Sequence, residues 1–299
     1  MRNKTTTAKA LLLTSAFFWG LGFLAIEGAL NSGWSPLAIL CVRGLLAGVL
    51  LLGIASFYKF PWYRNKKLLG HSVISGVVFW LAFLINIYGQ QKSTVSMTSI
   101  LTGSYVILTP FIAFFFAKHQ VTKRVYFSCV LAFIAVLVIS YRNGKLDFSI
   151  GEMLLLVSAV LFSLHFLLVE FLGNYRVAFA TSGIQLLILG GLSSILMLIE
   201  GKGIPSTGWP YVLYLGIMAS GFGFVLQVIA QQYIASSSAC VILSLESVFG
   251  VIGAGLFFNE PFNWQTVVGG GLMLAAIYFL ERKVESEEYS PAIIEEAVD

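Results

Sequence analysis

The chain has 299 residues, of which 58% are hydrophobic and only 11% are charged, and its mean hydropathy is +0.88. A soluble domain carries roughly 25% charged residues, so these charges are too few to cover a water-soluble globule of this length. The three cysteines lie in apolar runs, which argues against a disulfide scaffold, and the dispersed basic residues do not favour nucleic-acid binding. Composition therefore predicts an integral membrane protein.

Long uncharged runs alternate with short polar connections along the chain. A helix needs roughly 20 apolar residues to cross about 30 Å of hydrocarbon. Because the runs are continuous rather than alternating, a β-barrel is not expected. We predict ten transmembrane helices, at residues 9–29, 35–57, 70–91, 95–117, 124–141, 150–171, 177–199, 210–232, 237–258 and 264–281. Turn residues fill the connections at Asn31-Ser32-Gly33, Asn143-Gly144, Gly201-Lys202-Gly203 and Asn259-Glu260-Pro261.

The basic residues near the helix ends predict the orientation in the membrane. Alternate ends carry 13 Lys and Arg on one side and 4 on the other. Cytoplasmic loops carry the excess of Lys and Arg, so both termini are expected in the cytoplasm, with the chain multi-pass in the plasma membrane. Residues 284–299 are rich in acids and contain no base, which predicts a disordered cytoplasmic tail.

An internal repeat relates the two halves of the sequence. The segment 89–96, which begins Gly-Gln-Gln, matches 230–237, which begins Ala-Gln-Gln, at an offset of 141 residues. A shift of one or two residues from this offset sets Arg43 near Gln185, and it sets Phe18-Trp19-Gly20 on Leu161-Phe162-Ser163. The repeat unit is five helices, and an odd number places the second half upside down in the membrane. The predicted fold is all-α, with ten transmembrane helices in two inverted five-helix repeats, an arrangement that supports alternating access around a central site.

This pattern resembles the EamA-type transporters of the drug/metabolite transporter superfamily. The residues that carry the resemblance are Phe17-Phe18-Trp19-Gly20, Arg43, the stretch from Thr98 to Pro110, and Glu246 with Phe258-Asn259-Glu260-Pro261. It implies repeats at residues 1–145 and 146–283 and a transport function without a defined cargo. Two segments depart from the family pattern: Lys118-His119-Gln120 replaces a Gly-Glu turn, and no proline follows Glu246.

Three ionisable residues stand out inside the predicted spans, where a charge costs roughly 3 kcal/mol and marks a functional candidate. Arg43 is expected to bind an anionic group of the cargo, and Glu27 lies at a depth that would let it pair with Arg43. The alternatives are a structural ion pair, or a Glu27 that reaches the lipid headgroups. Glu246 is nearly central and is expected to bind a proton or a cargo amine; otherwise it is a protonated, hydrogen-bonded residue.

Other polar and aromatic residues in the spans are weaker candidates. Tyr105 is the repeat counterpart of Glu246 and is expected to face the same cavity. His165 is a candidate proton relay or a packing residue, and Gln185 either contacts cargo or joins helices. The remaining candidates are two tryptophans that either line the cavity or pack, and a proline expected to bend the fourth helix: Trp19, Trp80 and Pro110.

An intramembrane enzyme is not expected, because the sequence shows no nucleophile–base motif and no metal or cofactor motif. The sequence instead predicts a secondary transporter that moves a small organic metabolite, an amino acid or a related compound, across the plasma membrane. Export is favoured by the resemblance alone, and proton coupling and a homodimer are left open. The alternatives are an uptake carrier for a nucleobase, vitamin or sugar-type metabolite, and a membrane scaffold or receptor subunit.

Overall fold

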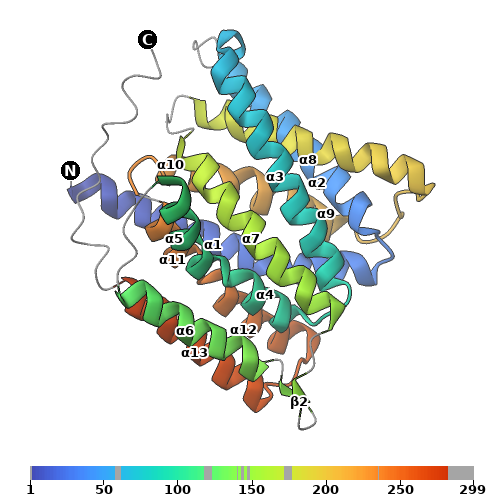
Figure 1. The fold of residues 1–299 in the computed structure, drawn as a ribbon. Coiled ribbons are helices and arrows are strands. Elements are labelled where there is room, and N and C mark those ends of the chain that lie inside the picture. Colours follow the sequence, from blue (N-terminus) through green and yellow to red (C-terminus); the bar gives the residue numbers. More distant parts are fainter. Residues whose placement is uncertain are drawn as a thin grey trace.

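The protein is an all-helical bundle with one short β-hairpin (Figure 1). The computed structural model describes residues 2–57, 62–117, 123–139, 141–142, 145–146, 149–171, 177–234 and 236–281. The predicted turn at 143–144, the segment 118–122 that departs from the family pattern, and the tail at 284–299 lie outside the described residues.

The first half of the chain forms six α-helices, a short 3₁₀ turn and the hairpin. They are α1 (Arg2–Asn31), α2 (Pro36–Ser56), η1 (Trp62–Arg64), α3 (Lys66–Gln90), α4 (Val95–Gly103), α5 (Tyr105–Ala117), α6 (Lys123–Ile139), β1 (Tyr141–Arg142) and β2 (Lys145–Leu146). The two strands pair antiparallel, with Tyr141 opposite Leu146.

The second half forms a matching series. Its elements are α7 (Ile150–Phe171), α8 (Ala178–Glu200), α9 (Trp209–Tyr214), the π-helical segment η3 (Leu215–Gly223), α10 (Phe224–Ala230), α11 (Ser236–Leu243), α12 (Glu246–Phe258) and α13 (Trp264–Glu281). Helical structure therefore occupies each of the ten apolar segments predicted from the sequence. Eight segments within the described residues are long and apolar enough to cross a membrane; α6 and α13, with 17 and 18 residues, are not among them.

Local sequence fixes several helix ends. Ser35, Asn65 and Thr94 accept hydrogen bonds from backbone N–H groups three residues downstream, as N-cap side chains do. At the other end, Gly201 and Asn259 adopt left-handed conformations with φ of 63° and 52°, which ends α8 and α12. The turn residues at Gly201-Lys202-Gly203 and Asn259-Glu260-Pro261 thus terminate helices as predicted.

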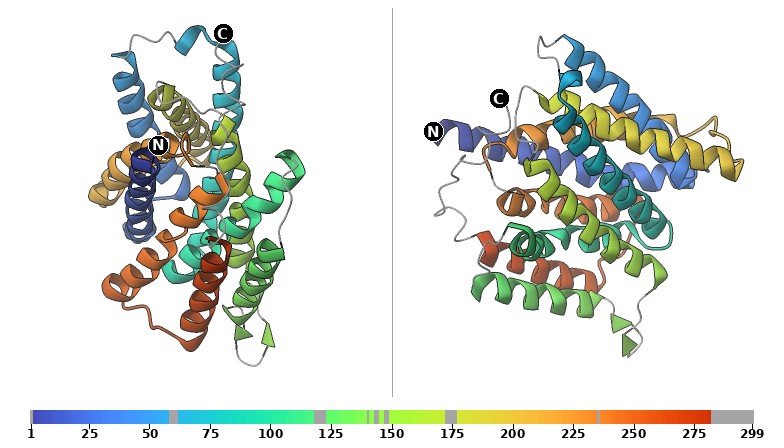
Figure 2. Two further views of the ribbon diagram at one scale, coloured as in Figure 1. Left: turned by 90° about the vertical axis from the view of Figure 1, so that its left-hand side faces the viewer. Right: turned by 45° about the horizontal axis from the view of Figure 1, so that its top comes forward.

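The helices pack in pairs. Helix α2 packs against α8 at one edge of the bundle, and α6 packs against α13 at the opposite edge (Figures 1 and 2). Between these edges, α1 packs along α9, η3 and α10, while α3 packs along α7. The central helices therefore form two pairs, and the functional candidates lie between them.

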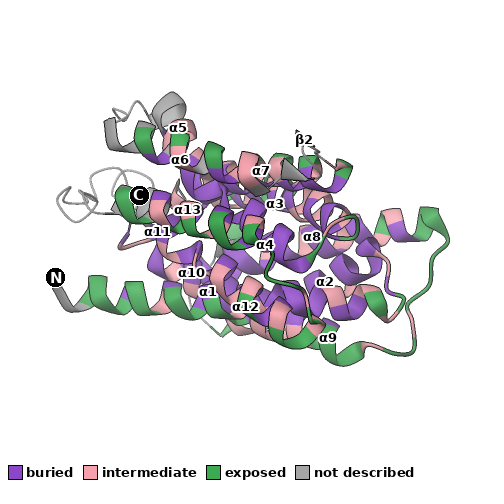
Figure 3. Ribbon diagram, turned by 90° about the horizontal axis from the view of Figure 1, so that it is seen from below, coloured by how far each residue is buried: buried purple, intermediate pink, exposed green. Residues whose placement is uncertain are grey.

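Polarity is arranged as expected for a protein in lipid. Large apolar side chains such as Val49, Phe133 and Leu256 are exposed, whereas Arg43, His165 and Glu246 are buried. Figure 3 shows buried segments toward the middle of the bundle and exposed segments toward its periphery. Burial of charge at the centre of an apolar bundle is costly and is retained mainly where it serves a function.

Helix α5 continues through Pro110, and the interruption of this span lies six residues earlier, at Ser104. The helix therefore divides ahead of Pro110, and the bend expected at Pro110 itself stays a prediction. The second half divides at the corresponding place, between Leu243 and Glu246, although it lacks the proline. A serine hydroxyl at each interruption donates 2.6 Å to a carbonyl three residues upstream, from Ser104 to Leu101 and from Ser244 to Val241, and this bond competes with the helix ladder.

Glycines allow the close approach of α2 and α8. A Cβ atom built on Gly44 would lie 2.7 Å from the Cα atom of Gly190, a contact with rigid backbone. We expect Gly44→Ala to lower the free energy of unfolding in detergent by about 1–3 kcal/mol, the usual cost of overpacking. Gly53→Ala on the same helix is the control, because a Cβ atom there meets nothing within 4 Å. Equal stability of the two variants would contradict the packing described.

Candidate functional site

A cavity with an empty volume of about 550 Å³, part of it open to the exterior, lies between the two central helix pairs. The α1 wall consists of α1, η3 and α10, and the α3 wall consists of α3 and α7. Residues from both walls, from α2 and from the two interrupted helices line the cavity: Trp19, Gly22, Phe23, Ile26, Arg43, Phe79, Phe83, Asn86, Thr102, Tyr105, Phe162, His165, Phe166, Leu215, Ala219, Gln227 and Glu246. The lining is mostly apolar and aromatic with a few polar groups, which is typical of a small-molecule site.

The α1 wall is held together by hydrogen bonds to backbone carbonyls. Trp19 donates its indole N–H to Ala219 at 2.8 Å, and Ser15 donates to Gly223 at 2.9 Å. In the reverse direction, Tyr214 donates to the carbonyl of Phe18 at 3.0 Å. Wide π-helical turns often occur at functional sites, and here the carbonyls of η3 serve as the acceptors.

Arg43 extends from α2 to the gap between the walls. Its Nε donates to Ser220 Oγ at 2.9 Å, and its guanidinium carbon lies 4.4 Å from the centre of the Phe83 ring. The residue is only 3% exposed, yet one terminal nitrogen, Nη1, has no hydrogen-bond partner. A buried guanidinium with an unpaired N–H group is well suited to bind an anion.

Glu246 and Tyr105 are brought together where the two interrupted helices meet the cavity. Each is the first residue of the helix that follows an interruption, α12 or α5. The two side chains interact electrostatically, but the Tyr105 hydroxyl is buried without a hydrogen bond of standard geometry. The carboxyl and the hydroxyl therefore both retain capacity to bind a ligand.

The sequence predicted that Glu27 could pair with Arg43, but the two residues do not pair in the structure. It is half-buried, lies outside the cavity lining, and contacts Asn31 and Gln90 through bonds of 3.4 Å. The side chain faces the end of α3 rather than α2. Within the described part of the chain, Arg43 has no ion-pair partner, and Glu246 and Arg43 do not pair with each other.

His165 is the residue nearest the cavity in a buried series of hydrogen bonds that continues to Gln185 and Ser75. Its Nε2 lies 2.9 Å from Gln185 Oε1, which also accepts from Ser75 at 2.9 Å. The imidazole stacks on Phe79, with ring centres 4.4 Å apart. His165 therefore lines the cavity, whereas Gln185 lies behind it and orients the histidine.

The two tryptophan candidates lie in different environments in the structure. Trp19 lines the cavity, but Trp80 does not: its indole N–H donates to Ser193 of α8 at 3.1 Å. Trp80 thus joins α3 to α8.

No group of three or more His, Cys, Asp or Glu among the described residues is arranged to hold a metal ion.

Two glutamates cap the interrupted helices, a role that the sequence analysis did not identify. The Glu260 carboxylate accepts from the N–H groups of Val95 and Ser96, at 2.8 and 3.0 Å, at the start of α4. Glu170 accepts from the N–H of Ser236 at 3.2 Å, at the start of α11. Negative charge at a helix N-terminus is stabilising. The capped residues lie 164 and 165 positions from Glu260 and 66 positions from Glu170, so local spacing gives no signal for these contacts.

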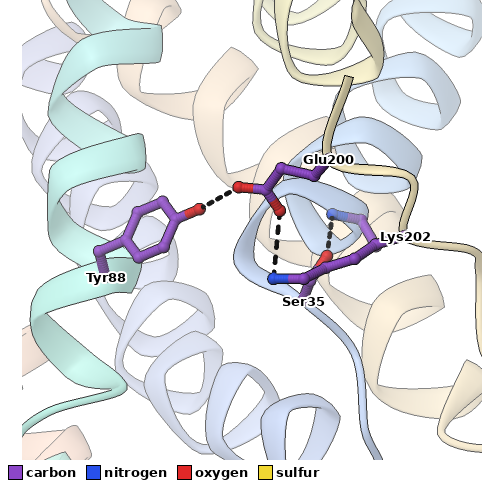
Figure 4. Close-up of polar contacts among 5 residues, drawn as sticks. Ser35, Tyr88, Glu200 and Lys202 are labelled. Atoms are coloured by element: carbon purple, nitrogen blue, oxygen red, sulfur yellow. Dashed lines mark hydrogen bonds and ion pairs between the residues drawn. The ribbon is translucent and has the colours of Figure 1, made fainter. Parts of the chain in front are cut away.

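Side chains also join the helix ends outside the cavity. Tyr88 on α3 points to Glu200 at the end of α8 and donates to it at 3.2 Å, and Glu200 pairs with Lys202 at the same distance (Figure 4). Nearby, the buried Trp34 donates to the carbonyl of Thr207 at 2.7 Å and packs edge-on against Trp209. The first connection of the first half is therefore fixed to the α8–α9 connection of the second.

The indole hydrogen bond of Trp19 gives a direct test of the α1 wall. We expect Trp19→Phe to lower the free energy of unfolding by about 1 kcal/mol, because the Ala219 carbonyl loses its cross-helix donor while the aromatic ring is kept. Phe17→Leu is the control, since Phe17 is exposed on the outside of the same helix. Thermal unfolding in detergent measures both variants, and an unchanged Trp19→Phe protein would contradict the assigned bond.

Comparison with known proteins agrees with this architecture. The sequence profile of the EamA-like transporter family matches the chain twice, at residues 6–141 and 149–282. An uncharacterized transporter of Archaeoglobus fulgidus is 26% identical over 90% of this chain and 84% of its own length. The uncharacterized transporter YetK of Bacillus subtilis is 24% identical over 86% of this chain and 82% of its own length.

More distant relatives include a biotin transporter of Salmonella typhimurium, 20% identical over 92% of this chain and 93% of its own length. A solved crystal structure superposes with a TM-score of 0.68 at 15% identity, covering 94% of this chain and 99% of the other, which supports the fold alone. Since the family profile matches nearly the whole chain, the protein belongs to the EamA-like transporter family.

Proposed function

We propose that the chain is a secondary transporter that carries a small zwitterionic metabolite, an amino acid or a related compound, through the central cavity by alternating access. The observation that carries this proposal is that Arg43 and Glu246 are both buried, both line the cavity, and do not pair with each other. A buried guanidinium and a buried carboxyl kept apart in an apolar site are costly unless a ligand engages them.

The cavity chemistry defines the cargo class. A carboxylate would accept from the free Nη1 of Arg43, and an ammonium group would bind Glu246 with the Tyr105 hydroxyl beside it. Phe79, Phe83 and other aromatic lining residues supply a surface for an apolar or aromatic side chain. With a single arginine in the lining, a multiply charged anion is poorly matched.

The proposed alternating access relies on ten membrane-spanning helices arranged as two inverted repeats. The interrupted helices begin at Val95 and Ser236, and resume at Tyr105 and Glu246; both pairs are separated by the 141-residue offset of the sequence repeat. The helix packing repeats in the same way, because α1 packs along α9–α10 as α7 packs along α3.

Side-chain contacts at the interrupted helices support an inverted two-fold relation. The backbone carbonyl of Ser99 on α4 accepts from the Ser247 hydroxyl of α12, and the Ser99 side chain lies against Gly250. The repeat partners of Ser99 and Gly250 are Cys240 and Thr109, and these two contact each other at 3.4 Å where α11 meets α5. The contact between α4 and α12 is therefore repeated between α11 and α5, with each residue replaced by its partner from the other half. A two-fold axis between the repeats requires this correspondence.

The lining also combines repeat partners with different chemistry. Trp19 corresponds to Phe162, Asn86 to Gln227 and Tyr105 to Glu246 under the sequence offsets, and every one of these residues faces the cavity. A symmetric scaffold with asymmetric side chains would allow two related states that bind one cargo. We place the protein in the plasma membrane with both termini cytoplasmic, and favour export on the family resemblance alone.

The second candidate is uptake of a monocarboxylate vitamin. The biotin transporter among the relatives favours it, and Arg43 alone would satisfy such a cargo. The two proposals differ at Glu246, which a zwitterion needs and a monocarboxylate does not. A scaffold or receptor role is less well supported, because it gives no reason for a cavity lined by an unpaired arginine and a buried carboxyl.

Flux in proteoliposomes tests these roles. Arg43→Gln is expected to reduce saturable flux of every carboxylate cargo by 100-fold or more, as expected when about 3 kcal/mol of charged hydrogen bonding is lost. Glu246→Gln is expected to abolish flux of amino acids. Lys202→Gln, at an exposed site, is the control. Unchanged amino-acid flux in Glu246→Gln with loss in Arg43→Gln would favour the monocarboxylate carrier, and no saturable flux by the wild type across a broad panel would contradict transport.

Proton coupling is tested with an imposed pH gradient. If the Glu246 carboxyl carries the coupled proton, a gradient is expected to drive cargo accumulation by the wild-type protein, and His165→Gln is expected to keep this response because the histidine is already hydrogen-bonded to Gln185. Wild-type flux that is indifferent to the gradient would instead identify a facilitator in which Glu246 binds cargo only.

A further inference from the structure

The repeated Gln-Gln segment has no role in the transport scheme above, although it is the strongest match between the halves. Gln90 is the last residue of α3, and its partner at the 141-residue offset is Gln231, which directly follows α10. Both side chains are buried, with exposed fractions of 0% and 1%. Buried amides at the ends of membrane helices require partners.

Gln90 joins the two walls of the cavity. It belongs to the α3 wall, and its Nε2 donates to the carbonyl of Phe23 in the α1 wall at 2.9 Å. A second, longer contact of 3.4 Å reaches Glu27 on the same helix as Phe23. Since Phe23 lines the cavity, the amide holds the α1 backbone at the cavity edge.

Gln231 makes the same connection in the opposite direction. It follows α10 in the α1 wall, and its Nε2 donates to the carbonyl of Phe166 in the α3 wall at 3.3 Å. Its Oε1 accepts from Gln227 at 2.8 Å. Phe166 and Gln227 both line the cavity. The offset of 143 that aligns Phe18-Trp19-Gly20 with 161–163 also aligns Phe23 with Phe166, so donor and acceptor are both repeat partners.

The two connections lie at opposite ends of the cavity. Gln90 contacts the C-terminal part of α1, near Glu27. Tyr233, two residues after Gln231, lies 5.8 Å from the Lys4 ammonium at the start of α1. The 23 residues between Lys4 and Glu27 span about 35 Å at 1.5 Å per helical residue. One glutamine therefore bridges the walls at each end.

We propose that Gln90 and Gln231 are matched positioning residues that hold the two ends of the cavity closed in turn. This inference rests on the proposed alternating access. Opening either end requires the α1 and α3 walls to separate there, which breaks the amide–carbonyl bond at that end and leaves the other intact. The shorter bond and the additional Glu27 contact make the Gln90 end the more firmly held in this conformation.

Side-specific thiol labelling tests the inference without cargo. Cys41, Cys129 and Cys240 are replaced by alanine, and Ala219→Cys serves as a reporter, because Ala219 lines the cavity. A membrane-impermeant maleimide is applied to either face of oriented vesicles. Gln90→Leu is expected to raise the ratio of labelling from the Gln90 end to labelling from the Gln231 end about fivefold, the effect of one lost buried hydrogen bond on a two-state equilibrium. Gln231→Leu is expected to lower that ratio by a similar factor.

The adjacent glutamines are matched controls. Gln91 is exposed, and Gln232 donates to the carbonyl of Val228 in α10, within the same wall, so Gln91→Leu and Gln232→Leu are expected to leave the ratio unchanged. If the leucine variants do not fold, Gln90→Met and Gln231→Met remove the donor with less change in shape. Shifts in the same direction, no shift, or a reporter that reacts from neither face would each overturn the inference. Absence of cargo flux would overturn the proposed function and leave the opposed shifts in place.

Discussion

The structure depends on one constraint: inside lipid, polar groups must find partners within the chain itself. The interrupted helices meet this constraint locally, because Ser104 and Ser244 donate to carbonyls beside the breaks and Glu260 and Glu170 accept from the N–H groups at the helix starts. The carbonyls of η3 accept from α1 for the same reason. Against this background, a buried unsatisfied atom on a residue that lines the cavity points to a ligand.

Three residues of the cavity lining carry such atoms, whereas the others lie elsewhere, on α3, α6 and α8. Arg43 Nη1 is buried without a hydrogen-bond partner, and the Tyr105 hydroxyl, buried beside Glu246, makes no hydrogen bond of standard geometry. A packing core has no reason to hold an arginine that only a serine and a phenylalanine ring engage. Such a group is explained by a ligand that completes its hydrogen bonds, and this is the physical basis for proposing transport of a charged metabolite.

The sequence was sufficient to predict the helical segments and five residues that line the cavity, namely Trp19, Arg43, Tyr105, His165 and Glu246. Apolar runs of membrane length are sufficient to place helices, and the repeat offset alone placed Tyr105 opposite Glu246. Sequence reasoning failed where the outcome depends on side-chain direction and distant partners. Glu27 has the depth to meet Arg43 but faces Gln90 instead, and Trp80 contacts α8 rather than the cavity. The glutamate caps, the π-helical turns of η3 and the break ahead of Pro110 arise from contacts between segments far apart in the chain, which no local pattern encodes.

The central claim is that the two halves lie in opposite orientations across the membrane, with the cavity between them. Lys92 and Tyr233 are repeat partners, each just beyond the end of the third helix of its half. The direct measurement is side-specific labelling of Lys92→Cys and Tyr233→Cys, each introduced singly into cysteine-free protein in intact cells. Reaction of the two positions from opposite faces of the membrane is the predicted result. Reaction of both from the same face would contradict the inverted arrangement and, with it, the alternating-access scheme.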